Sequence, residues 1–269
     1  MIEALGATLV LVLAATVAGA VNSVAGGGTL FTFPALLGVG AAPLTANGTS
    51  TFSLVPGSLS SVLGYRRELG GARNLALALI PPSLVGGWLG AQLALWSSDA
   101  LFARLVPWLI LGATLLFLMN DRLRRRFAPD LAEQVAKAPP SPSPSGRRLL
   151  ALAAMQLAVA IYGGYFGAGM GILMLAALGL AGETDVHRMN ALKNLAGACI
   201  NGMGTITFIL GDRVVWRWAL PMALGAIVGG YTGAGVARRI GQANVRRMVV
   251  AIGLGLAAWM LWRQASAPR

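Results

Sequence analysis

The residues best suited to chemistry in this sequence are three asparagines and one lysine. Asn190, Asn194 and Asn201 follow one another at spacings of four and seven residues, with Gly197 between them, and these spacings place side chains on one stripe of a helix. Lys193 lies beside that stripe in an apolar stretch. Because amides and an ammonium group in lipid surroundings need polar partners or a cavity, the stripe predicts a polar site inside a membrane protein.

Two other interpretations of this stripe stay open. Buried amides also form hydrogen bonds between membrane helices that only hold a bundle together. Lys193 lies about two turns from the polar segment 182–188, so its side chain can instead extend to the membrane interface.

A matching polar stripe occurs in the first half of the chain. When the second half is aligned on the first at one constant offset, Asn47, Ser50, Thr51 and Ser58 fall on Asn190, Lys193, Asn194 and Asn201, respectively. Two polar stripes at equivalent positions predict a central cavity shared by both halves.

Two glycine-rich stretches interrupt the apolar sequence. One is Asn22-Ser23 followed by Gly26, Gly27 and Gly28, and the other contains Gly163, Gly164, Gly167 and Gly169. Glycine permits unwound backbone whose amides can point at an anion. The alternative is close packing of helices through small residues, which we prefer for Gly225, Gly229 and Gly233 at spacings of four.

The sequence has no catalytic signature. It lacks His-Glu-x-x-His, Gly-x-Ser-x-Gly and Walker motifs, so we expect a protein that is not an enzyme and needs no cofactor. His187, the only histidine, suits proton coupling by type, but its polar segment favours a solvated loop residue. A coupling proton or sodium ion stays open, because no membrane-embedded Asp or Glu marks its site.

Composition makes lipid the solvent for most of the chain. Of 269 residues, 56% are hydrophobic and 11% charged, and the mean hydropathy is +0.70, which is too apolar for a water-soluble domain. Hydrocarbon admits only helices or a closed barrel, and the continuous apolar runs select helices. The net charge of +12 does not indicate nucleic acid, because the basic residues lie almost entirely between apolar runs.

We therefore predict an all-α polytopic membrane protein with about 8–10 membrane segments. The long segments are residues 5–21, 43–65, 72–96, 101–119, 149–165, 186–210, 214–237 and 245–262. Residues 29–37 and 170–180 are shorter than a span and predict half-helices or shortened helices. Residues 1–20 lack the basic region of a cleavable signal, so we expect them to form the first membrane segment.

An internal repeat divides the chain into two homologous halves, each opening with a glycine-broken helix pair. The offset that pairs Asn47 with Asn190 also places Gly86-Gly87-Trp88 on Gly229-Gly230-Tyr231, and a slightly smaller offset places Gly26-Gly27-Gly28 on Gly167-Ala168-Gly169. We predict an N-terminal transmembrane repeat over residues 1–120, a cytoplasmic basic and Pro/Ser-rich linker over 121–148, and a C-terminal transmembrane repeat over 149–269.

The distribution of charge favours inverted over parallel repeats. If each broken pair crosses the membrane twice, each half has five spans, and the loop with Arg238, Arg239, Arg246 and Arg247 lies in the cytoplasm beside the linker. The equivalent loop, residues 97–100, then lies outside and carries only Asp99. One crossing per pair would place four arginines outside. The favoured arrangement puts Arg263 and Arg269 outside, so the positive-inside rule, by which basic loops stay in the cytoplasm, is not satisfied everywhere.

These motifs resemble those of the TauE/SafE family of sulfite and organosulfonate exporters. The resemblance rests on Asn22-Ser-Val-Ala-Gly-Gly-Gly28, Ala46-Asn-Gly-Thr-Ser50, Gly163-Gly-Tyr-Phe-Gly-Ala-Gly-Met-Gly171 and Asn190-Ala-Leu-Lys-Asn194. It covers nearly all of the chain except the linker and the ends. It implies a multi-pass protein of the bacterial inner membrane that exports small anions such as sulfite, sulfoacetate and other organosulfonates.

We expect a secondary transporter that binds its substrate between inverted repeats and works by alternating access. Its expected partners are a small anion of the sulfite and sulfonate class and membrane lipid, without metal or nucleic acid, and homodimerisation stays open. The alternatives are a passive anion channel and a non-transporting membrane assembly protein. The expected substrate-binding residues are Asn22, Ser23, Gly26, Gly28, Asn47, Thr51, Gly167, Gly169, Asn190, Lys193, Asn194 and Asn201.

Overall fold

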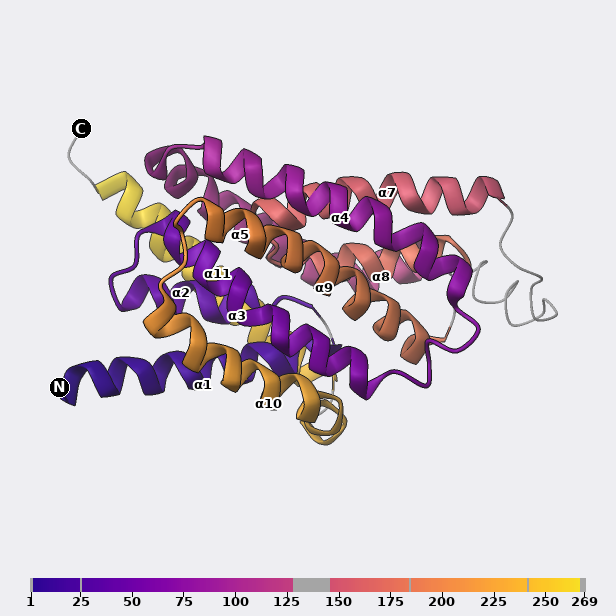
Figure 1. Ribbon diagram of the computed structural model, residues 1–269, viewed down its shortest axis with the longest axis horizontal. Helices are drawn as coiled ribbons and strands as arrows, with labels where there is room; N and C mark the ends of the chain where they lie inside the picture. Colours follow the sequence, from indigo (N-terminus) through magenta and orange to yellow (C-terminus); the bar gives the residue numbers. More distant parts are fainter. Residues whose placement is uncertain (1, 25, 128–145, 184, 241, 267–269) are drawn as a thin grey trace.

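The computed structural model describes residues 2–24, 26–127, 146–183, 185–240 and 242–266. Within these ranges the chain forms ten α-helices and no strand (Figure 1). The predicted all-α fold is therefore confirmed. The helices are α1 (Ile2–Val24), α2 (Thr29–Gly38), α3 (Pro43–Gly64), α4 (Arg73–Trp96), α5 (Asp99–Phe127), α7 (Gly146–Tyr165), α8 (Met170–Leu180), α9 (Val186–Leu210), α10 (Trp216–Ile240) and α11 (Gln242–Ser266).

Side chains are distributed as in a membrane protein, with apolar groups outside and polar groups inside. Leu9, Trp108 and Leu224 are 60%, 59% and 67% exposed, whereas Asn47 is fully buried and Lys193 is 3% exposed. A water-soluble protein of this size would not expose so many large apolar side chains. Lipid must cover this surface, so the chain is a multi-pass membrane protein.

Three of the described helices are long and apolar enough to cross a membrane by composition alone: Leu5–Ser23 in α1, Arg73–Trp96 and Gly146–Tyr165. The long helices α3 and α9 do not reach the same hydropathy, because each buries a row of polar and small side chains. Their polar faces are enclosed by other helices, so they need not present a uniformly apolar surface to lipid.

The helix boundaries repeat along the chain as the sequence comparison predicts. Thr29 and Met170, which begin α2 and α8, are related by the same offset as the two glycine-rich stretches. The offset that pairs Asn47 with Asn190 also relates the first residues of α3 and α9, of α4 and α10, and of α5 and α11. The two halves are therefore built from the same five helices in the same order.

The two halves exchange their first helices. α1 packs along α10 of the second half, and α7 packs along α4 of the first half, while α3 and α9 meet at the centre. The predicted close packing through Gly225 is confirmed, because a Cβ added to it would lie 2.6 Å from Val12 O on α1. Each half therefore completes the other, which makes a single interlocked bundle.

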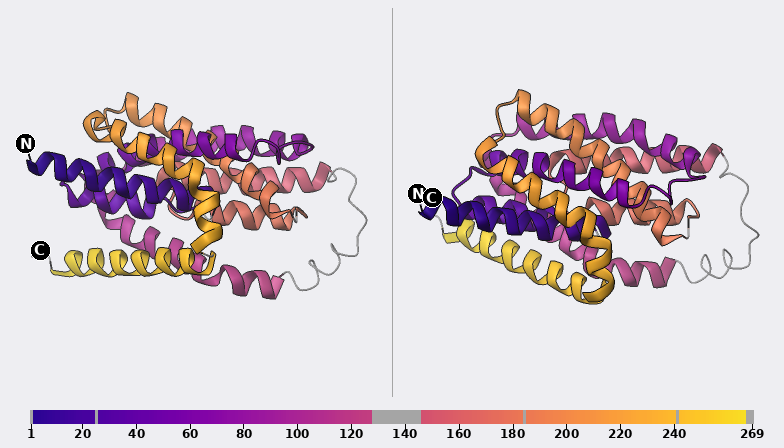
Figure 2. Two further views of the ribbon diagram at one scale, coloured as in Figure 1. Left: turned by 90° about the horizontal axis from the view of Figure 1, so that it is seen from below. Right: turned by 60° about the horizontal axis from the view of Figure 1, so that its bottom comes forward.

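Helices α1 and α7 run in opposite directions along the long axis of the molecule (Figures 1 and 2). α1 begins and α11 ends at one end of the bundle, and α5 ends and α7 begins at the other (Figure 2). These directions are the ones expected of two crossings per broken pair, and the inverted relation between the repeats stays a prediction.

The linker is shorter than the predicted range 121–148. α5 continues to Phe127 and α7 begins at Gly146, so helix occupies both ends of that range. Residues 122–126 are Arg and Leu, which are good helix formers, and they continue α5 beyond its apolar part. Residues 128–145 and the side chains of Arg238, Arg239 and Arg246, to which the topology prediction refers, lie outside the described part of the chain.

Candidate functional site: two helix breaks and a buried lysine

Each half contains one broken helix pair, at the predicted glycines. α1 ends at Val24 and α2 begins at Thr29, and α7 ends at Tyr165 and α8 begins at Met170. The breaks contain positive φ angles of 72° at Gly26, 125° at Gly27, 78° at Gly167 and 75° at Gly169. Only glycine adopts such angles without strain, so these residues end the first helix and turn the chain into the second.

The two breaks meet at the centre of the bundle. A Cβ added to Gly26 would lie 2.6 Å from the Cα atom of Gly171, in the first turn of α8. This approach places the end of α1 beside the beginning of α8. A negative helix end and a positive helix end therefore lie at one position inside the protein.

Lys193 of α9 reaches into the break between α1 and α2. Its Nζ donates to Asn22 O at 3.0 Å, to Ser23 O at 3.2 Å and to Asn190 Oδ1 at 3.0 Å. Asn22 and Ser23 lie in the last turn of α1, where backbone carbonyls have no partner within the helix. The ammonium group therefore caps the negative end of α1.

Two amides complete this contact. Asn194 Nδ2 donates to Ser23 O at 3.2 Å, and Asn22 Oδ1 accepts from Gly27 N at 3.2 Å. Thus α9 is joined to the end of α1 by two consecutive side chains, and Asn22 holds the unwound segment onto its own helix. Lys193 and Asn194 are 3% and 4% exposed, so the alternative in which Lys193 extends to the membrane interface is wrong.

The second break, between α7 and α8, has neutral partners. Asn47 Nδ2 donates to Tyr165 O at 3.0 Å, at the end of α7. Tyr162 Oη donates to Ala168 O inside the break, and Ser50 shares a hydrogen bond with Thr32 of α2. Ser50 is the position equivalent to Lys193, but its hydroxyl bonds to α2, which follows the first break.

A small cavity lies where the two breaks meet. Its volume of about 10 Å³ has room for about one water molecule. Ser58 Oγ, on its wall, has no hydrogen-bond partner among the described protein atoms. The lining residues are Asn22, Gly26, Ser58, Met170, Gly171, Met174, Lys193, Asn194 and Gly197.

The electrostatic character of this cavity is positive. All of the acidic side chains that the structure describes lie at helix ends or in the connections between helices, namely Glu68, Asp99, Glu183, Asp185 and Asp212. None of them lines the cavity or accepts a hydrogen bond from Lys193. The ammonium charge is therefore balanced only by neutral oxygens, and the N-terminus of α8 adds to the positive potential.

The structure brings together half of the predicted binding residues. Asn22, Ser23, Gly26, Asn190, Lys193 and Asn194 line the cavity or bond to the lysine. The other six do neither: Gly28, Asn47, Thr51, Gly167, Gly169 and Asn201. Of these, Asn47 caps α7, and Thr51 Oγ1 donates to Asn47 O one turn earlier in its own helix. Asn201 is buried, with an Nδ2 that has no hydrogen-bond partner in the described part of the protein.

Five lining residues were not among the predicted binding residues: Ser58 and Gly197, which belong to the two predicted polar stripes, and three residues of α8. Met170, Gly171 and Met174 lie in the first turns of α8 and close the cavity from the second half. Their apolar side chains carry no signal of a binding site. The contact between Gly171 and Gly26 places these three residues at the cavity. The repeat in the sequence predicts only the break that precedes them.

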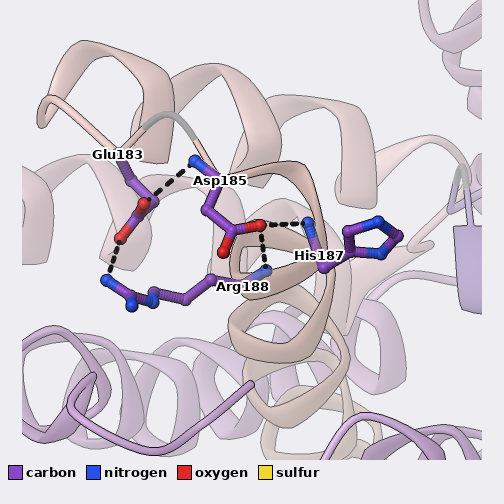
Figure 3. Close-up of polar contacts among 4 residues, drawn as sticks. All are labelled: Glu183, Asp185, His187 and Arg188. Carbon is purple, nitrogen blue, oxygen red and sulfur yellow. Dashed lines mark hydrogen bonds and ion pairs between the residues drawn. The ribbon is translucent and has the colours of Figure 1, made fainter. Parts of the chain in front are cut away.

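His187 lies in the first turn of α9 and away from the cavity. Asp185 is the N-cap, and its Oδ1 accepts from His187 N at 2.9 Å and Arg188 N at 3.3 Å. Glu183 forms an ion pair with Arg188 at 3.5 Å, while the exposed imidazole points away from these three side chains (Figure 3). His187 is thus an exposed residue at a helix start, as preferred from the sequence.

Comparison with known proteins gives one family. Residues 11–260 match the model of a family described as "Sulfite exporter TauE/SafE". The chain is 32% identical over 256 residues to a "Probable membrane transporter protein" of Haemophilus influenzae, covering 92% of each chain. It is 29% identical to the "Probable membrane transporter protein YfcA" of Escherichia coli K12, covering 94% of this chain and 89% of the relative. No solved structure matches the chain.

Proposed function

Because the chain belongs to the sulfite exporter TauE/SafE family of membrane transporters, we propose that it is a secondary transporter of small oxyanions. Its substrates are sulfite, sulfoacetate or related organosulfonates, which it exports across the bacterial inner membrane. The anion binds in the cavity between the two helix breaks. Alternating access follows from movement of the two interlocked halves about this cavity.

The observation that carries this proposal is the environment of Lys193. Its ammonium group is buried among oxygens that bear no full charge. A cation inside a membrane protein is costly unless a partner or a watery cavity compensates it. A small anion that enters the cavity supplies the missing negative charge, so the site has a physical reason to prefer anions over neutral solutes.

Three further groups suit an oxyanion. The first turn of α8 directs the positive end of its dipole at the cavity, through Met170 and Gly171. Ser58 contributes a hydroxyl without a hydrogen-bond partner among the described atoms, and the Asn194 amide also lines the cavity. These groups are hydrogen-bond donors from both halves, and both halves must contribute them for a substrate to bind between repeats.

The cavity in this conformation is too small for such a substrate. An oxyanion such as sulfite is larger than one water molecule, which is all that about 10 Å³ accommodates. We assign this conformation to a closed state of the transport cycle. Binding then requires α9 and the first turn of α8 to separate, and this separation is the movement that opens the site.

The exposed arginines support one orientation in the membrane. At the end where α5 ends and α7 begins, the exposed side chains include Arg66, Arg67, Arg73, Arg147 and Arg148. The opposite end has Arg213 and Arg217 beside Asp99 and Asp212. By the positive-inside rule the first end faces the cytoplasm, so export proceeds from that end toward the end with both termini.

Counterflow in proteoliposomes tests the proposal. Vesicles loaded with unlabelled sulfite or a short sulfonate are diluted into labelled substrate, for the wild type, for Lys193→Met and for His187→Ala. We expect saturable, transient accumulation of label in the wild type and in His187→Ala, whose side chain is exposed and does not line the cavity. Lys193→Met is expected to lose it, because the buried charge is gone.

Two results would contradict the proposal. Non-saturable flux without counterflow would indicate a channel, because a channel equilibrates solute without exchange. The absence of flux for every tested anion in a folded, monodisperse wild type would favour a non-transporting protein, in which the amides only hold the helices together.

A further inference from the structure

Two carbonyls at the end of α1 and one side-chain oxygen of α9 lie in an arrangement that suits a small cation. Asn22 O, Ser23 O and Asn190 Oδ1 all lie within 3.0–3.2 Å of one point, the Nζ atom of Lys193. Two of them are carbonyls in the last turn of a helix, the negative end of its dipole. Unwound carbonyls and helix C-termini at a broken membrane helix are where transporters bind a coupling cation.

All three N–H groups of the ammonium are used by these oxygens. Lys193 therefore has no donor left to point at a substrate in this conformation, and it acts on the cavity through its charge. The Lys193 ammonium group therefore resembles a bound cation more than a residue that hydrogen-bonds to the substrate. A bound cation also contacts carbonyl oxygens on one side and presents its charge to the cavity on the other.

The second break differs, because the contacts described there do not include three oxygens around one cation. There the end of α7 is capped by the amide of Asn47, at a single carbonyl of Tyr165. Within the described part of the chain, such a set of three oxygens around one cation therefore occurs at the first break and not at the second. A neutral amide is enough to cap the end of α7. Capping of the helix end therefore does not by itself explain why the first break has an ammonium group.

We propose that Asn22 O, Ser23 O and Asn190 Oδ1 form a site for one monovalent cation, and that Lys193 fills it with a cation tethered to the chain. The protein then carries permanently the positive charge that a sodium-coupled transporter takes from solution. The consequence for transport, which rests on the proposed function, is that wild-type anion flux needs no sodium. The cation site itself can be tested without any flux.

Truncation of the lysine provides a specific test. Lys193→Ala removes three methylenes and the ammonium group, and n-propylammonium is the fragment that replaces them. Lys193→Met also removes the charge, but its side chain occupies most of the same space and leaves no room for the fragment. Tetramethylammonium has the same charge without N–H donors, so it controls for ionic strength and for charge alone.

The measurement is thermal unfolding of the purified protein in detergent. We expect n-propylammonium at about tenfold its dissociation constant to raise the Tm of Lys193→Ala by about 4 °C, with no rise in the wild type or in Lys193→Met. Tetramethylammonium should leave all three unchanged. No shift of Lys193→Ala by n-propylammonium, or an equal shift of Lys193→Met, would overturn the proposal.

Flux measurements separate this inference from the proposed function. Replacement of sodium by choline is expected to change wild-type anion flux less than twofold, and a tenfold loss would show that transport needs sodium, which would overturn this consequence. If the Tm shift occurs while the wild type moves no anion, the cation site stands and the transport function fails. If anions move but no Tm shift occurs, transport stands and the tethered cation fails.

Discussion

The two helix breaks have the same backbone plan and different chemistry. Both place glycines with positive φ between a long and a short helix, and both end the long helix with capped carbonyls. The first break is capped by a lysine and an asparagine, and the second by an asparagine alone. Ser50 stands where the repeat would place a second lysine.

This difference teaches how a repeated scaffold acquires one site. Duplication supplies two equivalent breaks, and their meeting at Gly26 and Gly171 creates one shared cavity. A second buried ammonium next to the first would add like-charge repulsion inside a membrane, which is unfavourable. One charged break and one neutral break therefore suit a single small anion.

The largest expected effect is on stability, at the contact between the breaks. Gly26→Ala forces a Cβ to within 2.6 Å of the Gly171 backbone at a φ of 72°, so we expect a loss of about 3 kcal/mol of unfolding free energy. Gly167→Ala, with 2.9 Å to Gly163 O, should lose about 2 kcal/mol. Thermal unfolding in detergent measures both.

Gly40→Ala is the matched control for backbone strain. Its φ is 87°, but an added Cβ would meet nothing within 4 Å, so we expect a loss of only about 1 kcal/mol. If Gly26→Ala and Gly40→Ala were equally destabilised, the close contact between the breaks would be absent in the membrane.

The next largest effect is on transport, at Lys193 compared with Ser50, its equivalent position in the repeat. Lys193→Met should reduce anion flux about 100-fold, because loss of one partner of a buried charged pair costs about 2–5 kcal/mol. Ser50→Ala, which removes one neutral hydrogen bond to Thr32, should change flux less than threefold. Equal losses of flux in the two variants, measured per folded protein, would remove the asymmetry that we infer.

A third comparison pairs the two capping amides. Asn194→Ala and Asn47→Ala each leave a helix-end carbonyl without its donor, so each should lose about 1–2 kcal/mol of stability. Only Asn194 lines the cavity, so only Asn194→Ala should also lower flux, by about tenfold. A tenfold loss of flux in Asn47→Ala at matched stability would extend the binding site to the second break.

The smallest effect is expected at the surface, outside both breaks. Arg213 of the α9–α10 connection and Asp99, the first residue of α5, form an ion pair at 3.2 Å, with side chains 35% and 44% exposed. Solvent screens such a pair, so Arg213→Gln should lose about 0.5 kcal/mol, and less in high salt. A loss above about 2 kcal/mol would mean that this pair, and not the breaks, holds the halves together.

Much of the fold could be predicted because its signals are local. Apolar runs locate the helices, since hydrocarbon requires them, and the glycines locate the breaks. The boundary of α5 was missed because its charged end, Arg122 to Arg126, looked like linker although these residues favour helix. A helix can continue from the lipid into water, so the end of an apolar run need not be the end of the helix.

Part of the site could be predicted for a similar reason. A stripe of amides and a lysine in an apolar segment had to be buried against something polar, and Asn190, Lys193 and Asn194 are. The same argument placed Asn47 and Asn201 in the site, where the structure places neither. Spacing identifies a helix face, but it does not say which neighbour that face meets.

The sequence alone determined the membrane environment, the all-α fold and the two glycine breaks, because each depends on residues close together in the chain or on composition. Only the tertiary structure decided that α1 and α7 are exchanged between halves and that Gly26 touches Gly171. It also directed Lys193 at Asn22, which lies far earlier in the chain. Contacts between distant segments depend on how whole helices pack, and that is set by the shape of every helix in the bundle at once.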